Sequence, residues 1–340
     1  MYRGLDRKVA NDGLMRFYCT YFDKNYLVKG LTLYRSLQRH GGSFTLWVLC
    51  LDEATFEALS HLALPELRPV RLADLESADR ELHAARGNRS LIEYYFTLTP
   101  AWPLFLLERF PEVDLLTYVD SDLLFYSSPE PVFEELHDDA ILIIGHRFPE
   151  PLRHLERYGV YNVGFVTFRN DDRGRECLRW WREQCLQWCH DRFEDGRFAD
   201  QKYLDHWPGT MSGVRVLQHK GAGLAPWNWM NYALVFDGTS GTVDGEPLIF
   251  FHFHGFKIVN RWLFEPGDAP YRQMPRKLRR QLYGGYLREL AKTRSWLRST
   301  LPGREAATFG SVRYAAYNLH YTLYLLRHRQ LWPRVGFIPL

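Results

Sequence analysis

The sequence predicts an α/β fold with a Rossmann-like, doubly wound and mostly parallel central sheet. Strand-like and helix-like segments alternate from residue 14 to residue 75, which is typical of parallel sheets. Strand-like segments such as "FTLWVLCLD" (44–52) are apolar almost throughout, as expected for strands covered on both faces. Asp23, Asp52 and the pair Asp120 and Asp122 each follow such a segment. Open α/β sheets bind ligands at this carboxyl edge, so we expect the site there.

The first half of the chain supplies five elements. They are a strand, a helix, a strand, a helix and a strand, over residues 14–23, 25–42, 44–52, 53–64 and 67–75. The first helix has apolar residues at helical spacing, and Gly41 is placed to end it.

The second half continues this pattern. A long helical stretch (90–113) is expected to be interrupted by Pro100 and Pro103. It is followed by three strands, a helix and a late strand, over residues 114–122, 138–147, 161–171, 174–193 and 247–259. Three cysteines of this second helix lie roughly on one face, which we interpret as core packing because one helix face cannot surround a zinc ion.

Charge divides the chain near residue 270. Residues 271–340 hold 14 Lys and Arg residues against two acids, whereas the remainder is mildly acidic. We therefore expect a ligand-binding body (1–270) and a basic, mainly helical C-terminal extension (271–340). Basic tails bind anionic lipid or nucleic acid, or are simply solvated. Without an apolar signal segment or a readable disulfide pattern, we expect a cytoplasmic protein.

Asp120 and Asp122 are the strongest chemical signal. Two carboxylates this close repel one another unless a proton or a cation lies between them. At a strand end, residues i and i+2 can point to the same side, and paired carboxylate oxygens suit Mn²⁺ or Mg²⁺. The alternative is that Asp122 caps a turn while Asp120 is merely exposed.

"FFHFHGFK" (250–257) is a second candidate. His252 and His254 share one face of a strand, and a neutral imidazole is a common metal ligand. Gly255 suggests a close approach of the backbone to a ligand, and Lys257 would neutralise a phosphate. The alternative is two half-buried strand histidines.

Two further groups of polar residues stand out. Asp200 and Gln201 form a short polar patch, although Asp200 as a helix N-cap explains it equally. Trp227 and Asn228 suit stacking and hydrogen bonding to a sugar, or a buried Trp beside a turn Asn.

In this order the pieces resemble GT-A-type nucleotide-sugar glycosyltransferases, specifically the retaining enzymes of glycosyltransferase family 8 and related bacterial polysaccharide and lipopolysaccharide enzymes. The resemblance covers roughly residues 14–260. The segments that carry it are "YVDSD" (118–122), "YNVGFVTFRN" (161–170), "FADQKYLD" (198–205), "APWNW" (225–229) and "HFHG" (252–255).

The resemblance implies roles for these residues. Asp120, Asp122 and His252 would hold Mn²⁺ or Mg²⁺, with His254 as a rival ligand. The loop after His252 is about one residue shorter than in the family, and "Ile-Val" replaces Pro-Trp after Lys257. Asp200 and Gln201 would flank the transferred sugar as catalytic residues. The expected donor-binding set is Thr20, Tyr21, Asp23, Arg89, Asp120, Ser121, Asn162, Gly164, Trp227, Asn228, Gly255 and Lys257.

The implied activity is metal-dependent transfer of a sugar, with retention, from a nucleotide-sugar donor to a glycan or lipid-linked acceptor. UDP is the nucleotide that the resemblance favours. We expect a role in cell-surface polysaccharide or lipopolysaccharide synthesis. The basic extension would bind an anionic membrane surface at the inner face of the cytoplasmic membrane, and we expect no nucleic-acid partner.

Other classes fit less well. In haloacid-dehalogenase phosphatases a DxD motif opens the domain, whereas more than 100 residues precede Asp120 here. Sugar-1-phosphate nucleotidyltransferases need a Gly-rich loop after the first strand, and "TYFDKNYL" (20–27) has no glycine. A non-catalytic carbohydrate-binding protein explains the aromatic residues but not the carboxylate pair.

Overall fold

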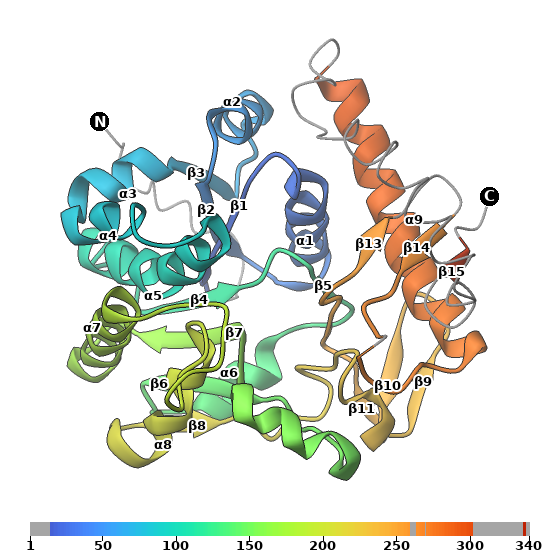
Figure 1. Cartoon of the computed structure of the whole chain (residues 1–340). Coiled ribbons are helices and arrows are strands. Elements are labelled where there is room, and N and C mark those ends of the chain that lie inside the picture. Colours follow the sequence, from blue (N-terminus) through green and yellow to red (C-terminus); the bar gives the residue numbers. More distant parts are fainter. Residues whose placement is uncertain (1–13, 259–262, 269, 302–335, 338–340) are drawn as a thin grey trace, which may run out of the picture.

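The computed structural model describes residues 14–258, 263–268, 270–301 and 336–337. Their main feature is a seven-stranded sheet of order β3-β2-β1-β4-β7-β6-β8 (Figure 1). Its strands are β1 (Arg16–Phe22), β2 (Phe44–Cys50), β3 (Leu67–Arg71), β4 (Leu115–Val119), β6 (Ile141–Gly145), β7 (Tyr161–Arg169) and β8 (Val214–Val216). Within this sheet, β7 pairs antiparallel with β4 and β6, and the remaining pairings are parallel. The predicted α/β, mostly parallel architecture is confirmed.

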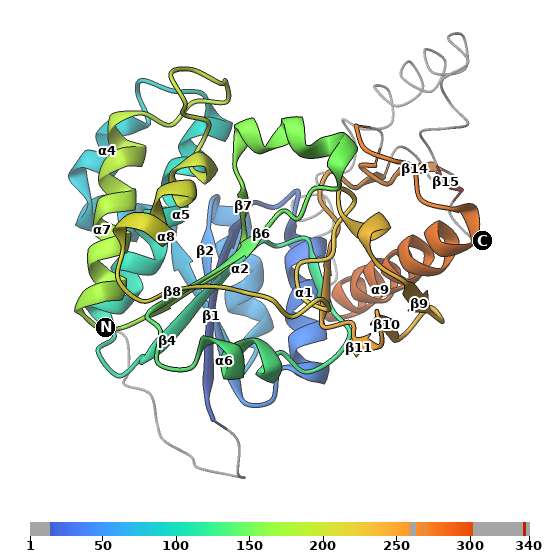
Figure 2. The ribbon, with the colours of Figure 1, turned by 90° about the horizontal axis from the view of Figure 1, so that it is seen from below.

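Helices cover both faces of the sheet (Figure 2). Side chains alternate along each strand, so Cys19 packs with α5 and α7 whereas Tyr18 packs with α1 and α6. The α-helices before the C-terminal extension are α1 (Leu27–His40), α2 (Glu53–Leu62), α3 (Leu72–Ala78), α4 (Arg80–Ala85), α5 (Leu91–Arg109), α6 (Glu130–Leu136), α7 (Asp172–Gln187) and α8 (Trp207–Thr210). Short 3-10 helices lie at η1 (Glu150–Tyr158), η2 (Gln201–His206) and η3 (Trp229–Asn231).

Two expected elements differ in detail. The strand predicted over 67–75 ends at Arg71, because Leu72 and Leu75 lie at helical spacing and are buried in α3. The helix predicted over 90–113 stays continuous through Pro100 and Pro103 from Leu91 to Arg109. Ser90 and Glu93 begin it with a reciprocal capping box.

Smaller sheets complete the fold. A two-stranded sheet pairs β5 (Leu123–Phe125) with β12 (Phe250–His252). The others are β9 (Leu234–Phe236) with β10 (Gly241–Val243) and β11 (Glu246–Pro247), and β13 (Lys257–Ile258) with β14 (Leu263–Glu265) and β15 (Gly336–Phe337).

The basic extension begins with a helix that packs on the body. This helix, α9 (Arg276–Thr300), lies beside α1 in Figure 1. Its buried residues Tyr283 and Tyr286 share a hydrophobic core with Phe253 and Phe256. The first part of the expected extension therefore packs with residues of the expected body. Residues 302–335 and 338–340 of the expected extension lie outside the described residues, and among those described no helix combines the length and apolarity needed to cross a membrane.

Candidate metal and donor site

The pairing of β12 with β5 builds the centre of the site. In this register His252 is opposite Leu123, so its side chain meets the carboxylates that flank the β4–β5 connection. His252 Nε2 lies 3.1 Å from Asp122 Oδ1 and 3.5 Å from Asp120 Oδ2. One ligand atom from each of the three residues lies within 4.8 Å of the others. The structure therefore brings together the three residues expected to bind a metal ion.

Burial and charge act in opposite directions in this cluster. Burial raises the pKa of Asp120, and the neighbouring Asp122 raises it further. Burial also opposes ionisation of Asp122, but the His252 imidazole and the Lys29 ammonium outweigh it and lower the pKa of Asp122 well below its usual range. Burial lowers the pKa of His252, but its contact with Asp122 reverses this and the net shift is upward. The cluster is a place where positive charge is stabilised.

The donor atoms fit a hard divalent cation. Carboxylate oxygens suit Mg²⁺ and Mn²⁺, and one imidazole nitrogen favours Mn²⁺ over Mg²⁺. His254 is exposed, its ring centroid lies 5.5 Å from that of His252, and it is outside the group of converging ligand atoms. Of the two histidines, His252 has the position of a ligand.

Gly164 makes room for this histidine. A Cβ at Gly164 would lie 2.8 Å from His252 Cε1 and 2.7 Å from Asn162 Oδ1, so a larger residue would force a shift. The carbonyl of Gly164 accepts from Asp120 N, and its N–H donates to Asn162 Oδ1. Asn162 and Gly164 thus lie beside the carboxylate–histidine cluster, as expected. Position 164 needs a glycine because a side chain there would collide with His252 and Asn162.

Asp200 and Gln201 lie next to this group. Asp200 is 6% exposed, and burial together with the charge of Asp120 raises the pKa of Asp200 to about 7. It makes no side-chain cap hydrogen bond to η2, so the N-cap interpretation is not supported. Asn162 Nδ2 donates across 3.5 Å to Gln201 Oε1, which places Gln201 beside Asn162.

A chain of hydroxyl groups links Asp200 with Asp120. Thr99 hydrogen-bonds Asp200 and lies 3.1 Å from Tyr21 OH. Tyr21 is also hydrogen-bonded to Tyr118, whose hydroxyl donates to Asp120 Oδ1 at 2.8 Å. The expected donor residue Tyr21 is therefore part of a buried network behind the carboxylates.

Other expected donor-binding residues of the first strand differ in their exposure. Thr20 is fully buried, and its backbone carbonyl accepts from Trp102 Nε1. Asp23 is partly exposed and accepts the backbone N–H groups of Asn25 and Tyr26. It shapes the turn that leads into α1. Ser121 is half-buried between the two carboxylates.

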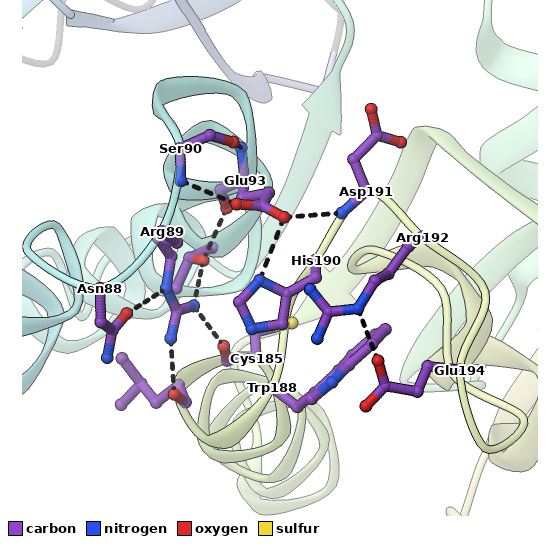
Figure 3. Close-up of polar contacts among 12 residues, drawn as sticks. Asn88, Arg89, Ser90, Glu93, Cys185, Trp188, His190, Asp191, Arg192 and Glu194 are labelled. Atoms are coloured by element: carbon purple, nitrogen blue, oxygen red, sulfur yellow. Dashed lines mark hydrogen bonds and ion pairs between the residues drawn. The ribbon is translucent and has the colours of Figure 1, made fainter.

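Arg89 differs from expectation. Its guanidinium donates to Cys185 O at 2.8 Å, to Leu186 O at 2.8 Å and to Thr97 Oγ1 at 2.7 Å (Figure 3). These bonds fasten the C-terminal end of α7 to the start of α5. In this structure Arg89 therefore anchors this helix end.

Trp227 and Asn228 also differ from the expected sugar contacts. Asn228 is fully buried, its amide donates to His146 O and Gly223 O, and its oxygen accepts from Ala225 N. It pins a turn and has no exposed surface for a sugar. Trp227 is 3% exposed, and its ring packs against the candidate ligand His252 with ring centroids 5.5 Å apart.

The loop after His252 presents exposed groups. Gly255 is exposed with φ +71°, a conformation that side chains disfavour. Lys257, in β13, is exposed one residue after the buried Phe256.

Three further residues near the site were not among the expected site residues, although Tyr118 belongs to the "YVDSD" segment (118–122). Tyr118 bonds Asp120, and Lys29 contributes charge to Asp122. His146 is buried, with Nε2 3.3 Å from Asn162 Nδ2, and burial lowers the pKa of His146 to about 3. The sequence offered one signal for His146, which is a polar residue directly after the end of β6.

The chain was compared with known families, relatives and structures. No family model matches it. The uncharacterized protein YfnF of Bacillus subtilis (strain 168) is 35% identical over 251 residues, which cover 72% of this chain and 82% of YfnF. The uncharacterized protein YfnD of the same strain is 32% identical over 245 residues, covering 71% of this chain and 78% of YfnD.

Among solved structures, the galactosyltransferase LgtC in complex with donor and acceptor sugar analogs matches with a TM-score of 0.54 at 15% identity. The match covers 86% of this chain and 99% of that one. It confirms the expected GT-A type of α/β fold.

Proposed function

The chain belongs to the same family as YfnF and YfnD and has a GT-A fold, and on this premise we propose that it is a metal-dependent glycosyltransferase. It transfers a sugar from a nucleoside diphosphate donor, UDP-sugar being favoured, to a glycan or lipid-linked acceptor. The observation that carries this proposal is the convergence of Asp120, Asp122 and His252 beside Asp200 and Gln201.

The chemistry follows from the charges of these groups. A divalent cation held by the Asp–Asp–His cluster supplies charge that neutralises the donor diphosphate. Lys257 stabilises the negative charge that the departing diphosphate gains. The transferred sugar acquires oxocarbenium character, and Asp200 or Gln201 stabilises it from the opposite face. The acceptor hydroxyl attacks from the face that the diphosphate leaves, which retains the anomeric configuration.

A panel of nucleotide sugars with and without Mn²⁺ tests this function. A ligand that binds only the folded state raises the melting temperature, and at a given concentration a tighter ligand raises it more. We expect one donor to stabilise the protein only when Mn²⁺ is present. Stabilisation by free sugars without any response to nucleotide sugars would instead indicate a carbohydrate-binding protein. An inverted anomeric configuration in the product, measured by NMR, would reject the same-face attack.

We also propose that the acceptor lies at the inner face of the cytoplasmic membrane, in cell-surface polysaccharide or lipopolysaccharide synthesis. Exposed cations on α9, among them Arg276, Lys277 and Arg280, would attract anionic lipid. Flotation with vesicles of phosphatidylglycerol should capture the protein at low salt, and phosphatidylcholine vesicles should not. Equal flotation with both lipids would reject the electrostatic contact.

A further inference from the structure

Lys29 occupies a position that helix stability does not explain. It is the third residue of α1, in the first turn, where the positive end of the helix dipole disfavours a cation. This turn contains no acidic residue, and Tyr26 provides no side-chain cap. A residue that breaks a local rule without a compensating gain for the fold often serves a site.

The side chain of Lys29 reaches the loop that follows His252. Its Nζ donates to Phe256 O at 3.1 Å and lies 4.2 Å from the centroid of the Tyr26 ring. Phe256 stands between Gly255 and Lys257, so two lysines from segments far apart in sequence converge on this loop. In Figure 1, the colours of α1 and of β13, the strand that begins at Lys257, lie far apart on the sequence scale.

The charge of Lys29 acts on the carboxylate cluster. It interacts electrostatically with Asp122, and it also repels Lys257 and His252. Within the described part of the chain, no carboxylate lies at ion-pair distance from its ammonium group. An ammonium has three N–H donors, and one is used by Phe256 O. Lys29 and Lys257 repel each other, and an anion of high charge bound by both ammonium groups would relieve this repulsion.

We propose that Lys29 binds the diphosphate of the donor together with Lys257. This inference rests on the proposed glycosyltransferase function. In that reaction the bond between the sugar C1 atom and the phosphate oxygen breaks, and its electron pair stays on the diphosphate. The acceptor oxygen forms the new bond to C1, and its proton passes to the departing diphosphate. Lys29 takes up no proton in this step. Its positive charge stabilises the departing diphosphate more strongly as negative charge builds up on the diphosphate oxygens.

Titration calorimetry with UDP, GDP and ADP in the presence of Mn²⁺ tests this inference. The variants are Lys29→Met, Lys29→Gln and Lys29→Arg, and the control is Lys220→Met, which removes an exposed lysine paired with Asp244 outside the site. Lys29→Gln keeps an N–H group for Phe256 O but loses the charge, so it gives the same comparison if Lys29→Met does not fold. Circular dichroism establishes which variants are folded.

We expect the nucleoside diphosphate that binds the wild type best to bind Lys29→Met and Lys29→Gln at least about tenfold more weakly. The corresponding monophosphate should lose less affinity, because the terminal phosphate is missing. Lys29→Arg should keep part of the affinity, and Lys220→Met should match the wild type. Binding of Mn²⁺ alone should be unchanged or tighter in Lys29→Gln, because a positive charge near the carboxylates is gone. If Lys29 had only a structural role, its loss would not weaken diphosphate binding while leaving Mn²⁺ binding intact.

Two outcomes overturn the inference, and they differ. If the wild type binds none of the three nucleoside diphosphates with Mn²⁺, the proposed function fails and the role of Lys29 with it. If the wild type binds one of them and Lys29→Gln binds it equally well, the role of Lys29 alone is rejected.

Discussion

His252 Nε2 lies 3.1 Å from Asp122 Oδ1 although the two residues come from distant parts of the chain. The register between β12 and β5 creates this contact, because it places His252 opposite the residue that follows Asp122. In the absence of a cation, the imidazole itself partners the carboxylates and its pKa is raised through Asp122. A divalent cation held by Asp120, Asp122 and His252 would supply a stronger positive charge to the carboxylates than the imidazole does.

Replacing Asp122 by Asn should weaken Mn²⁺ binding. Asn keeps the size of the side chain but removes the charge. Loss of a residue that only hydrogen-bonds a metal ligand already lowers metal affinity about tenfold or more, so loss of a charged ligand should cost at least as much. We expect Mn²⁺ to raise the melting temperature of the wild type and of Asp172→Asn, a control that removes a fully exposed acid. It should leave Asp122→Asn almost unchanged. Equal stabilisation of all three proteins would contradict the metal site.

Replacing Gly164 by Ala should disturb the same site by steric contact. The new methyl group meets the His252 ring and Asn162 Oδ1 at less than van der Waals distance. Overpacking of this kind costs about 1–3 kcal/mol in unfolding free energy. The affinity for Mn²⁺, measured by calorimetry, should fall as His252 moves.

Gly209→Ala is the matched control for this prediction. A Cβ at Gly209 in α8 meets no atom within 4 Å, and Ala is the better helix former. Its stability and metal affinity should equal or exceed those of the wild type. Identical metal affinity in Gly164→Ala would show that His252 is not a ligand.

Asp200→Asn should change stability in a pH-dependent manner. Asp200 has a pKa of about 7 in the folded protein, against an ordinary value of 3.8 for an aspartate side chain. The folded state therefore binds more protons between these values, and the unfolding free energy of the wild type falls as the pH rises. Three pKa units correspond to about 4 kcal/mol at most. In EDTA, Asp200→Asn should be more stable than the wild type at pH 8 and show no such gain near pH 4.

Urea unfolding at the two pH values measures this difference. A stability difference that is the same at pH 4 and pH 8 would show that Asp200 is ionised without penalty. The same variant should lose transfer activity if Asp200 stabilises the cationic sugar.

Tyr286→Ala should destabilise the body as well as α9. The ring of Tyr286 stacks on that of Phe253 with centroids 3.9 Å apart, and Phe253 directly follows His252. Removing a buried aromatic ring costs about 3–5 kcal/mol. Tyr286→Phe is the control, since the hydroxyl has no hydrogen-bond partner among the described residues, and it should be neutral or stabilising. If urea unfolds Tyr286→Ala and the wild type at the same midpoint, α9 is not part of the cooperative unit.

Local patterns in the sequence predicted the sheet and singled out Asp120 and Asp122, whereas His252 was expected beside them only from the family resemblance; the structure brings the three side chains together. The sequence did not reveal that β7 runs antiparallel, since alternation of side chains is the same in both directions. It also did not show that the polar groups of Asn228 and Arg89 are occupied by backbone contacts. Lys29 carries no local signal of function, because its neighbours at the site are contributed by tertiary packing.

Anomalous scattering from a crystal grown with Mn²⁺ and UDP tests the central claim most directly. The account predicts a manganese peak in bonding contact with Asp120, Asp122 and His252 Nε2, with the UDP diphosphate reaching the same ion. A peak elsewhere, or UDP bound without contact to the ion, would contradict it.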